Sequence, residues 1–411
     1  MSDSTHRTTA GAELDVARIR AHFPALAQGA AHFDGPGGSQ TPDVVADAIR
    51  DTLLSPLANR GTTTAAERNA ERAVTQCRAA LADLLRTTAD SVIVGRSMTA
   101  LTFDMSRMLA AQWSPGDEIV VSRLDHDANV RPWVIAAERA GVTVRWMDFD
   151  VRTGELTVDA LHRQLSGRTR LVAVTAASNL IGTMPDIPAF ADAAHDAGAR
   201  LYVDGVHYTA HTLVDVGALK ADFFACSPYK FLGPHCGVVT GRPELLEELR
   251  PDKLLPSPDR VPERFELGTL PYELMAGTTA AVTFLAGLAG ADGSRRQRLE
   301  AGMALVERHE DRLRARIEDG LSRLPGVTVH SRARRRTPTL LVTFDGVEPA
   351  AVSTFLAGRG VNAPAGSFYA HETAEQLGLG KPGGLRIGLA PYNDDADVDR
   401  LLTALDDYFT G

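Results

Sequence analysis

Short runs of apolar residues alternate with helical segments between residues 91 and 227, and this alternation constrains the fold more than any other feature. The expected strands are SVIVG (91–95), EIVVS (118–122), VTVRWMD (142–148), RLVAVTAAS (170–178), RLYVDG (200–205) and ADFFACS (221–227). Helical stretches such as 128–140 and 187–197 separate most of them. Strands that alternate with crossover helices form a largely parallel sheet with helices on both faces, so an α/β fold is predicted.

The pattern changes after about residue 270. A helical region over 272–324 leads into the strand-like stretches VTVHS, TLLVTFDG and GLRIGLA, and two further helices are expected at 349–358 and 394–408. This pattern indicates a smaller C-terminal α/β domain joined by a long helix. We expect three parts: a tail and a segment packed on the small domain (1–30), a large domain that carries the site (31–280), and the small domain (281–411).

The charge and the cysteine content exclude several classes of protein. The formal net charge of −9 argues against a nucleic-acid or anionic membrane partner. The basic run RARRR (332–336) is interpreted as a solvated loop. The chain has no apolar window of transmembrane length and no apolar segment near its N-terminus. Cys77, Cys226 and Cys236 form neither a metal-site spacing nor a disulfide framework, so no metal and a cytoplasmic location are expected.

Polar residues follow the expected strands, at the sheet edge where ligands of open α/β folds bind. Ser97, Met98 and Thr99 come after the first strand and open a helix. The free amides of a helix N-terminus suit a phosphate, although Ser97 could equally be a plain helix cap. His126 follows the second strand and could stack on a flat ring, act as an acid or base, or be a surface histidine.

Three more polar residues follow later strands. Asn179 could donate to an oxygen of a ligand or form a local turn. Asp204 comes directly after a buried strand, where a carboxylate is costly unless a cation faces it; the alternative is a helix cap. Lys230, one of only four lysines, would become a nucleophilic amine if apolar surroundings lowered its pKa, whereas most single lysines are surface residues.

Seven stretches carry these residues or lie near them: FDGPGGSQTP (33–42), LDHDANVRPW (124–133), SNLIGTMPDI (178–187), LYVDGVHYTAH (201–211), CSPYKFLGPHCGVVTG (226–241), RFELGTLP (264–271) and GLRIGLAPYNDDADVDRLL (384–402). Together they resemble the class V, fold-type I enzymes that use pyridoxal 5′-phosphate, in the cysteine desulfurase-like branch. The resemblance runs from about residue 30 to the C-terminus. It implies a mostly parallel seven-stranded sheet in the large domain and a smaller C-terminal α/β domain.

The resemblance also implies a role for each residue. Lys230 forms a Schiff base with the cofactor aldehyde and later moves protons at the substrate Cα. Asp204 pairs with the pyridine nitrogen, His126 stacks on the ring, and Asn179 binds the phenolic oxygen. His207 stands near that oxygen, where desulfurases often carry glutamine. The residues expected to hold the phosphate are Ser97, Met98, Thr99, Ser227 and Tyr229, with Thr269 reaching the phosphate of a neighbouring subunit. A homodimer with shared active sites is therefore expected.

Two departures from the family pattern bear on the reaction. Desulfurases carry a reactive cysteine on a small-domain loop, but the corresponding stretch VNAPAGSFYAHETAEQLG (361–378) has none. That loop usually begins with an arginine that grips the substrate carboxylate, and here Asn362 takes its place. Arg386 is our candidate for the carboxylate contact, with a structural ion pair as the alternative. Phe368 and Tyr369 either line a pocket for a larger, less polar substrate or pack within the loop.

The missing cysteine favours β-elimination from a cysteine S-conjugate over desulfuration of free cysteine, with an amino acid as the small-molecule substrate. The alternatives on the same cofactor are aminotransfer, epimerisation, and decarboxylation coupled to oxidative deamination. A non-enzymatic role in sulfur delivery is disfavoured, because the loop cysteine is absent while Lys230 and Asp204 are both present.

Overall fold

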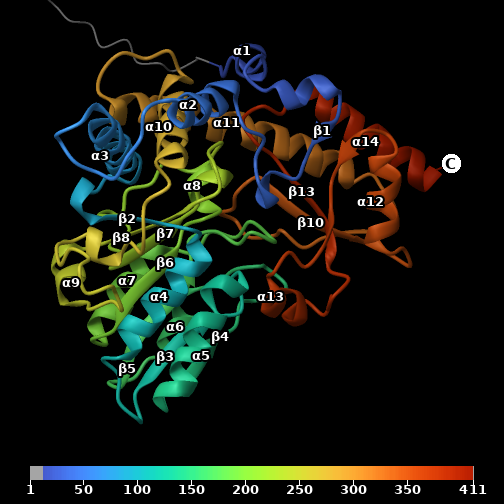
Figure 1. The fold of residues 1–411 in the computed structure, drawn as a ribbon. Helices are drawn as coiled ribbons and strands as arrows, with labels where there is room; N and C mark the ends of the chain where they lie inside the picture. Colours follow the sequence, from blue (N-terminus) through green and yellow to red (C-terminus); the bar gives the residue numbers. More distant parts are fainter. Residues whose placement is uncertain (1–12, 411) are drawn as a thin grey trace, which may run out of the picture.

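A seven-stranded sheet forms the centre of the larger part of the computed structural model, which describes residues 13–410. Its strands, in spatial order, are β2 (Val92–Gly95), β8 (Gly237–Gly241), β7 (Phe223–Cys226), β6 (Arg200–Asp204), β5 (Thr169–Thr175), β3 (Glu118–Ser122) and β4 (Thr143–Met147). Only β8 runs antiparallel to its neighbours, β2 and β7. The predicted α/β fold with a mostly parallel seven-stranded sheet is confirmed (Figure 1).

Helices cover both faces of this sheet, because its strands are apolar on both sides. Within β3, Val120 packs into one core cluster, whereas Ile119 and Val121 pack into another. The first cluster lies under α3 (Ala65–Leu85), α7 (Ile187–Asp196) and α10 (Tyr272–Gly287), and the second under α4 (Met98–Ala110) and α5 (Arg131–Ala140). Runs of apolar residues without alternation are what a sheet buried on both faces requires.

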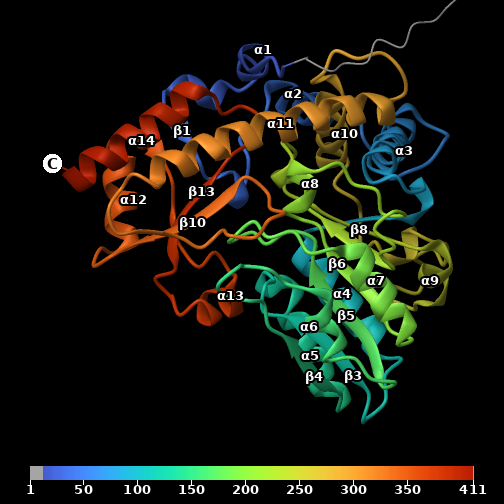
Figure 2. The same cartoon turned by 180° about the vertical axis from the view of Figure 1, so that it is seen from behind.

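A smaller antiparallel sheet follows in the C-terminal part of the chain. Its strands, in spatial order, are β12 (Ala365–Gly366), β13 (Gly384–Gly388), β10 (Thr339–Phe344) and β9 (Val327–Val329). Its core includes side chains from α11 (Arg295–Leu321), α12 (Pro349–Ala357) and α14 (Asp395–Thr410). Figure 2 shows α11 running from beside α10 to α14.

The helical region expected over 272–324 is divided into two helices, and this corrects the prediction of one long helix. Gly290 and Gly293 between them have φ angles of +61° and +115°. Glycine adopts positive φ angles at little steric cost because it has no Cβ atom, and such angles end a right-handed helix. Ser294 then starts α11, because its side chain accepts a hydrogen bond from the Gln297 backbone amide and the Gln297 Oε1 accepts one from the Ser294 backbone amide.

Shorter helices and turns complete the fold. The helices are α1 (Val16–Arg20), α2 (Asp43–Leu54), α6 (Val158–His162), α8 (Tyr208–His211), α9 (Pro243–Glu248) and α13 (His371–Gln376); the 3₁₀ turns are η1 (Pro24–Gln28), η2 (Gly35–Gly37), η3 (Ala89–Ser91), η4 (Asp127–Asn129), η5 (Pro228–Lys230) and η6 (Glu263–Phe265). Strands β1 (Ala31–His32) and β11 (Val361–Asn362) pair in parallel. The expected tail lies outside the described residues up to residue 12, and the domain boundaries near 30 and 280 stay predictions.

The antiparallel strand β8 fixes the turn that follows β2. A Cβ atom added to Gly237 would lie 2.1 Å from the carbonyl carbon of Ser97 and 2.2 Å from the amide nitrogen of Met98. Only glycine allows β8 to approach the start of α4 this closely. The first turn of α4 is thereby held against the same sheet edge as the ends of β5, β6 and β7.

Between residues 13 and 410, no helix is long and apolar enough to cross a membrane.

Candidate active site

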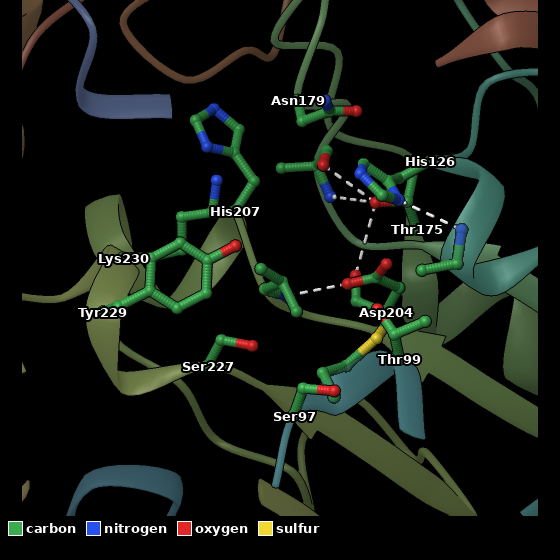
Figure 3. Close-up of a pocket in the computed structure, with 14 residues that line it drawn as sticks. Ser97, Thr99, His126, Thr175, Asn179, Asp204, His207, Ser227, Tyr229 and Lys230 are labelled. Carbon is green, nitrogen blue, oxygen red and sulfur yellow. Dashed lines mark hydrogen bonds between the residues drawn. The ribbon is translucent and has the colours of Figure 1, made fainter. Parts of the chain in front are cut away.

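A cavity lies at the carboxyl ends of the parallel strands, and ten of the predicted site residues line it. They are Ser97, Met98, Thr99, His126, Asn179, Asp204, His207, Ser227, Tyr229 and Lys230 (Figure 3). They come from the segments after five different strands, β2, β3, β5, β6 and β7. The alternation of strands and crossover helices therefore brings together residues that are up to 133 positions apart in the chain.

Lys230 is the last residue of η5, directly beyond β7, and its amine faces the cavity. Its Nζ donates a hydrogen bond to the Pro36 carbonyl oxygen and lies 4.9 Å from the centre of the Tyr229 ring. Burial lowers the pKa of Lys230 to about 7, and the nearby Arg386 charge contributes in the same direction. A large fraction of the amine is therefore uncharged near neutral pH, as a nucleophile requires.

Asp204 ends β6 and is only 4% exposed. Its Oδ1 accepts a hydrogen bond from the Val206 amide at 2.9 Å. Burial raises the pKa of Asp204 to about 6, because the charged form has lost its hydration. A cation placed against this carboxylate would reverse that cost, so the residue fits the protonated ring nitrogen of pyridoxal 5′-phosphate.

The turn after β2 forms the end of the cavity suited to a phosphate. Ser97 caps α4, a helix of 13 residues, and its Oγ accepts a hydrogen bond from the Ala100 amide at 3.1 Å. The amides of Met98 and Thr99 lie in the first turn, where a helix has no acceptors of its own. Ser227 and Tyr229 also line the cavity. Capping by Ser97 and phosphate binding by the following amides are compatible in this geometry.

His126 and Asn179 also contact the cavity. The Nδ1 of His126 accepts a hydrogen bond from the Ala128 amide at 3.0 Å, which places the ring proton on Nε2. Burial lowers the pKa of His126 to about 4, so the ring is neutral and suited to stacking. Asn179 donates from Nδ2 to the Phe368 carbonyl oxygen at 3.0 Å. Its buried Oδ1 has no partner among the described residues.

The loop around Phe368 and Tyr369 closes one side of a second cavity that adjoins the first. Both residues have left-handed backbone conformations, with φ of 51° and 58°. Such conformations in bulky residues cost about 1–3 kcal/mol each and persist only when their surroundings hold them. Here the Tyr369 carbonyl accepts a hydrogen bond from the Asp127 amide at 2.7 Å, and the Tyr369 ring stacks on His126 with centroids 5.5 Å apart.

Arg386 lines the second cavity from β13 and is 2% exposed. Its Nη1 donates to the Asn179 carbonyl at 3.1 Å, and its guanidinium carbon lies 3.6 Å from the centre of the Phe368 ring. Within residues 13–410, its Nε atom has no hydrogen-bond partner. Burial lowers the pKa of Arg386 to about 9. The guanidinium thus keeps a donor that a substrate carboxylate could use.

Asn362 and Thr269 lie apart from the lining of both cavities. The Nδ2 of Asn362 is 3.2 Å from the Nδ1 of His32, so its side chain is engaged with the last residue of β1. Thr269 is exposed in the loop before α10. The roles predicted for these two residues stay predictions.

Sequence reasoning missed several cavity residues. Thr175 ends β5, and a polar residue at a strand end was a signal that could have been used. Phe103 lies one helical turn beyond Thr99, so the periodicity of α4 could have placed it. Pro36 and Gly37 lie within FDGPGGSQTP, one of the stretches that carry the family resemblance. Arg131 lies within another of these stretches, LDHDANVRPW.

The three cysteines lie away from the loop over 361–378, and all are buried free thiols. Burial raises the pKa of Cys236 to about 11, and it also raises those of Cys77 and Cys226. A thiol reacts as its thiolate, so these cysteines are poorly suited to accept sulfur from a substrate.

The pKa of Lys230 predicts an unusual pH dependence for attachment of pyridoxal 5′-phosphate to the apoprotein. The neutral amine is the reactive form, so the rate should rise with pH to about 7 and then level off, instead of rising towards the usual lysine value of 10.5. Stopped-flow absorbance between about pH 5.5 and 10 measures this rate. Lys220→Arg, which changes an exposed lysine paired with Asp192, should not alter the profile. A continued rise above pH 9 would contradict the assignment.

Replacing Asp204 should weaken cofactor retention and turnover together. Asp204→Asn removes the anion from the end of the cavity, and breaking one partner of a buried charge pair costs about 3–5 kcal/mol, so we expect a loss of roughly two orders of magnitude or more. Equilibrium dialysis and turnover assays measure both effects.

Asp125→Asn is the matched control for this substitution. Burial raises the pKa of Asp125 to about 8, so its carboxyl is already neutral at pH 7. Its contacts with Ser122 and Asn129 can be kept by an amide. Near-normal activity is expected for Asp125→Asn, and equal losses in the two variants would argue against a charge role for Asp204.

Comparison with known proteins agrees with this geometry. The family model for aminotransferase class-V matches residues 31–401. The cysteine desulfurase CsdA of Escherichia coli is 32% identical over 95% of this chain and 96% of that protein, and its crystal structure superposes with a TM-score of 0.84 over 96% of this chain and 98% of that chain, at 28% identity. An uncharacterized protein of Mycobacterium tuberculosis is 32% identical over 95% of this chain and 98% of its own length. The chain therefore belongs to the aminotransferase class-V family and is a pyridoxal 5′-phosphate-dependent enzyme that resembles the cysteine desulfurases.

Proposed function

We propose that the enzyme cleaves the C–S bond of a cysteine S-conjugate by β-elimination. The products are a thiol and, after hydrolysis, pyruvate and ammonia. The observation that carries the proposal is the loop over 361–378, which closes the substrate side of the site without a cysteine. Transfer of sulfur to the enzyme needs an accessible thiolate, and the chain's three thiols are buried. Elimination of an already substituted sulfur needs no such acceptor.

The residues of the site support proton removal at the substrate Cα. Bound pyridoxal 5′-phosphate supplies the electron sink for this chemistry. The Lys230 amine, with its lowered pKa, can take the Cα proton near neutral pH. Asp204 keeps the ring nitrogen protonated, and the neutral His126 ring covers one side of the cofactor site.

The second cavity supports an apolar substituent on the substrate sulfur. Phe103, Phe368 and Tyr369 contribute aromatic surface to it. Arg131, the cation at its edge, is paired with Asp127 at 3.0 Å and with Glu372 at 3.6 Å, so its charge is largely balanced. Arg386 would bind the substrate carboxylate between this cavity and Lys230. These features favour an alkyl or aryl cysteine conjugate over free cysteine.

A substrate screen tests the proposal. The holoenzyme should release one pyruvate and one thiol for each S-benzyl- or S-alkylcysteine consumed, measured with lactate dehydrogenase and a thiol reagent. Lys230→Ala should lose this activity, and free cysteine should yield no enzyme-bound persulfide. The proposal fails if the same substrates give a pyridoxamine form of the cofactor, the opposite enantiomer, or carbon dioxide with oxygen uptake. Those outcomes identify aminotransfer, epimerisation and oxidative decarboxylation respectively.

We also propose that the enzyme is a homodimer whose active sites are shared. Large apolar side chains are exposed at Leu53 and Leu54 and again at Leu254, Leu255 and Leu267; Leu255 is 98% exposed. Thr269, predicted to reach the neighbouring phosphate, is exposed two residues after Leu267. Exposed large apolar side chains of this kind favour association when they lie together at an interface. The cytoplasm stays the predicted compartment, since the cysteines are free thiols.

Sedimentation analysis should give twice the chain mass of 44.0 kDa. Leu255→Glu should shift the protein towards the monomer, because a charge would be buried in the interface. Val151→Glu is the control, since Val151 is also an exposed apolar residue but lies in the loop after β4. A monomeric wild-type enzyme with full activity would refute the shared site.

A further inference from the structure

His207 has two ring nitrogens in contrasting surroundings. It follows β6 by three residues and is buried. Its Nε2 lies 2.9 Å from the Thr339 hydroxyl and 3.0 Å from the Thr337 hydroxyl. Its Nδ1 is buried and has no hydrogen-bond partner among the described residues. Figure 3 shows the ring at the cavity wall beside Lys230. A buried polar atom without a partner at a ligand cavity indicates a contact made with the ligand.

The hydroxyl of Thr339 decides which nitrogen carries the proton. Thr339 is fully buried in β10, and within residues 13–410 the His207 Nε2 is the only partner found for its hydroxyl. If Nε2 carried a hydrogen, the Thr339 hydroxyl proton would be left buried without an acceptor. The Thr337 hydroxyl has a second acceptor, the Gly182 carbonyl, only at 3.4 Å, which is long for such a bond. Nε2 therefore accepts, and the proton of the neutral ring lies on Nδ1.

The surroundings keep the ring neutral. Burial lowers the pKa of His207 well below its ordinary value, and the charges of Lys230 and Arg386 act in the same direction. The His211 ring packs edge-on with centroids 4.8 Å apart, and His211 is itself hydrogen-bonded to Glu310 at 2.8 Å. No second proton is therefore expected on His207 at physiological pH. Its single N–H is available to the cavity.

We propose that Thr339 fixes the tautomer of His207 so that the Nδ1–H donates to the anionic phenolic oxygen of pyridoxal 5′-phosphate. Thr339 belongs to the small antiparallel sheet, whereas His207 follows a strand of the large sheet. Thr339 is a positioning residue, because it acts on the cofactor only through His207. The inference rests on the cofactor and is independent of whether the enzyme breaks a C–S bond.

Nitrogen NMR of the holoenzyme tests the tautomer directly. In protein labelled with ¹⁵N-histidine, with His207→Gln used to assign the signals, Nδ1 should show the shift of a protonated ring nitrogen and Nε2 that of an unprotonated one. The reverse pattern would overturn the proposal. This measurement needs no change to the threonines, so it stands even if the threonine variants fold poorly.

A spectral titration tests the positioning role. A donor to the phenolic oxygen favours the deprotonated form of the cofactor bound at Lys230. Thr339→Val should therefore raise the pH midpoint of the visible absorbance by about 0.5–1 unit, the worth of one weakened hydrogen bond. His207→Ala should raise it at least as much, and adding Thr339→Val to His207→Ala should change nothing further.

Thr343→Val is the matched control. Thr343 lies on the same strand, β10, and its hydroxyl makes the same kind of bond, 2.8 Å from the Nε2 of His330. His330 does not line either cavity. The control should leave the midpoint unchanged. An equal shift in Thr343→Val and Thr339→Val, or a further shift in the His207→Ala/Thr339→Val double variant, would show a general effect on the sheet and overturn the proposal. Failure of the C–S lyase assay would leave these results untouched.

Discussion

The burial of Lys230 and Asp204 at one edge of the parallel sheet is the constraint on which the rest of the site depends. Asp204 ends one strand that is apolar on both faces, and Lys230 lies on the turn after the next, so both side chains face the cavity at that edge of the sheet. The loss of hydration lowers the pKa of the amine and raises that of the carboxylate. This loss of hydration makes the Lys230 amine a nucleophile, and it allows the Asp204 carboxylate to bind a cation. A ligand with an aldehyde and a basic ring nitrogen offsets both costs at once.

The small sheet completes this site from the opposite side. Arg386 on β13 and Thr339 on β10 lie on paired antiparallel strands, Arg386 opposite Leu341 and Thr339 opposite Gly388, and their side chains act on different parts of the site. Arg386 faces the second cavity, and Thr339 contacts His207. The strained loop at Phe368 and Tyr369 is anchored by Asn179 and by the amide of Asp127. Changes in the packing of the two sheets would therefore alter substrate access and cofactor environment together.

Local sequence patterns predicted many helices and strands, because whether a segment forms a helix or a strand depends largely on the residues within that segment. The run at 118–122 forms β3 with the predicted bounds, and the helix expected at 187–197 is α7. The break between α10 and α11 was missed, because helical periodicity continues on either side of two glycines whose backbone conformation is set by packing. Strand β8 was not among the six expected strands, and its antiparallel direction depends on strand partners far away in the chain.

The sequence by itself determined the chemistry available: one lysine and one aspartate after apolar strands, a helix start suited to phosphate, and a substrate loop without cysteine. The sequence did not determine which side chains from remote segments contact one another. The engagement of Asn362 with His32, the docking of Phe368 on Arg386 and the two hydroxyls at His207 each join residues of different sheets or loops. Only the tertiary structure decided these contacts. Each joins segments that are remote in the chain, and a change of a few tenths of an ångström in their spacing makes or breaks a hydrogen bond or a ring contact.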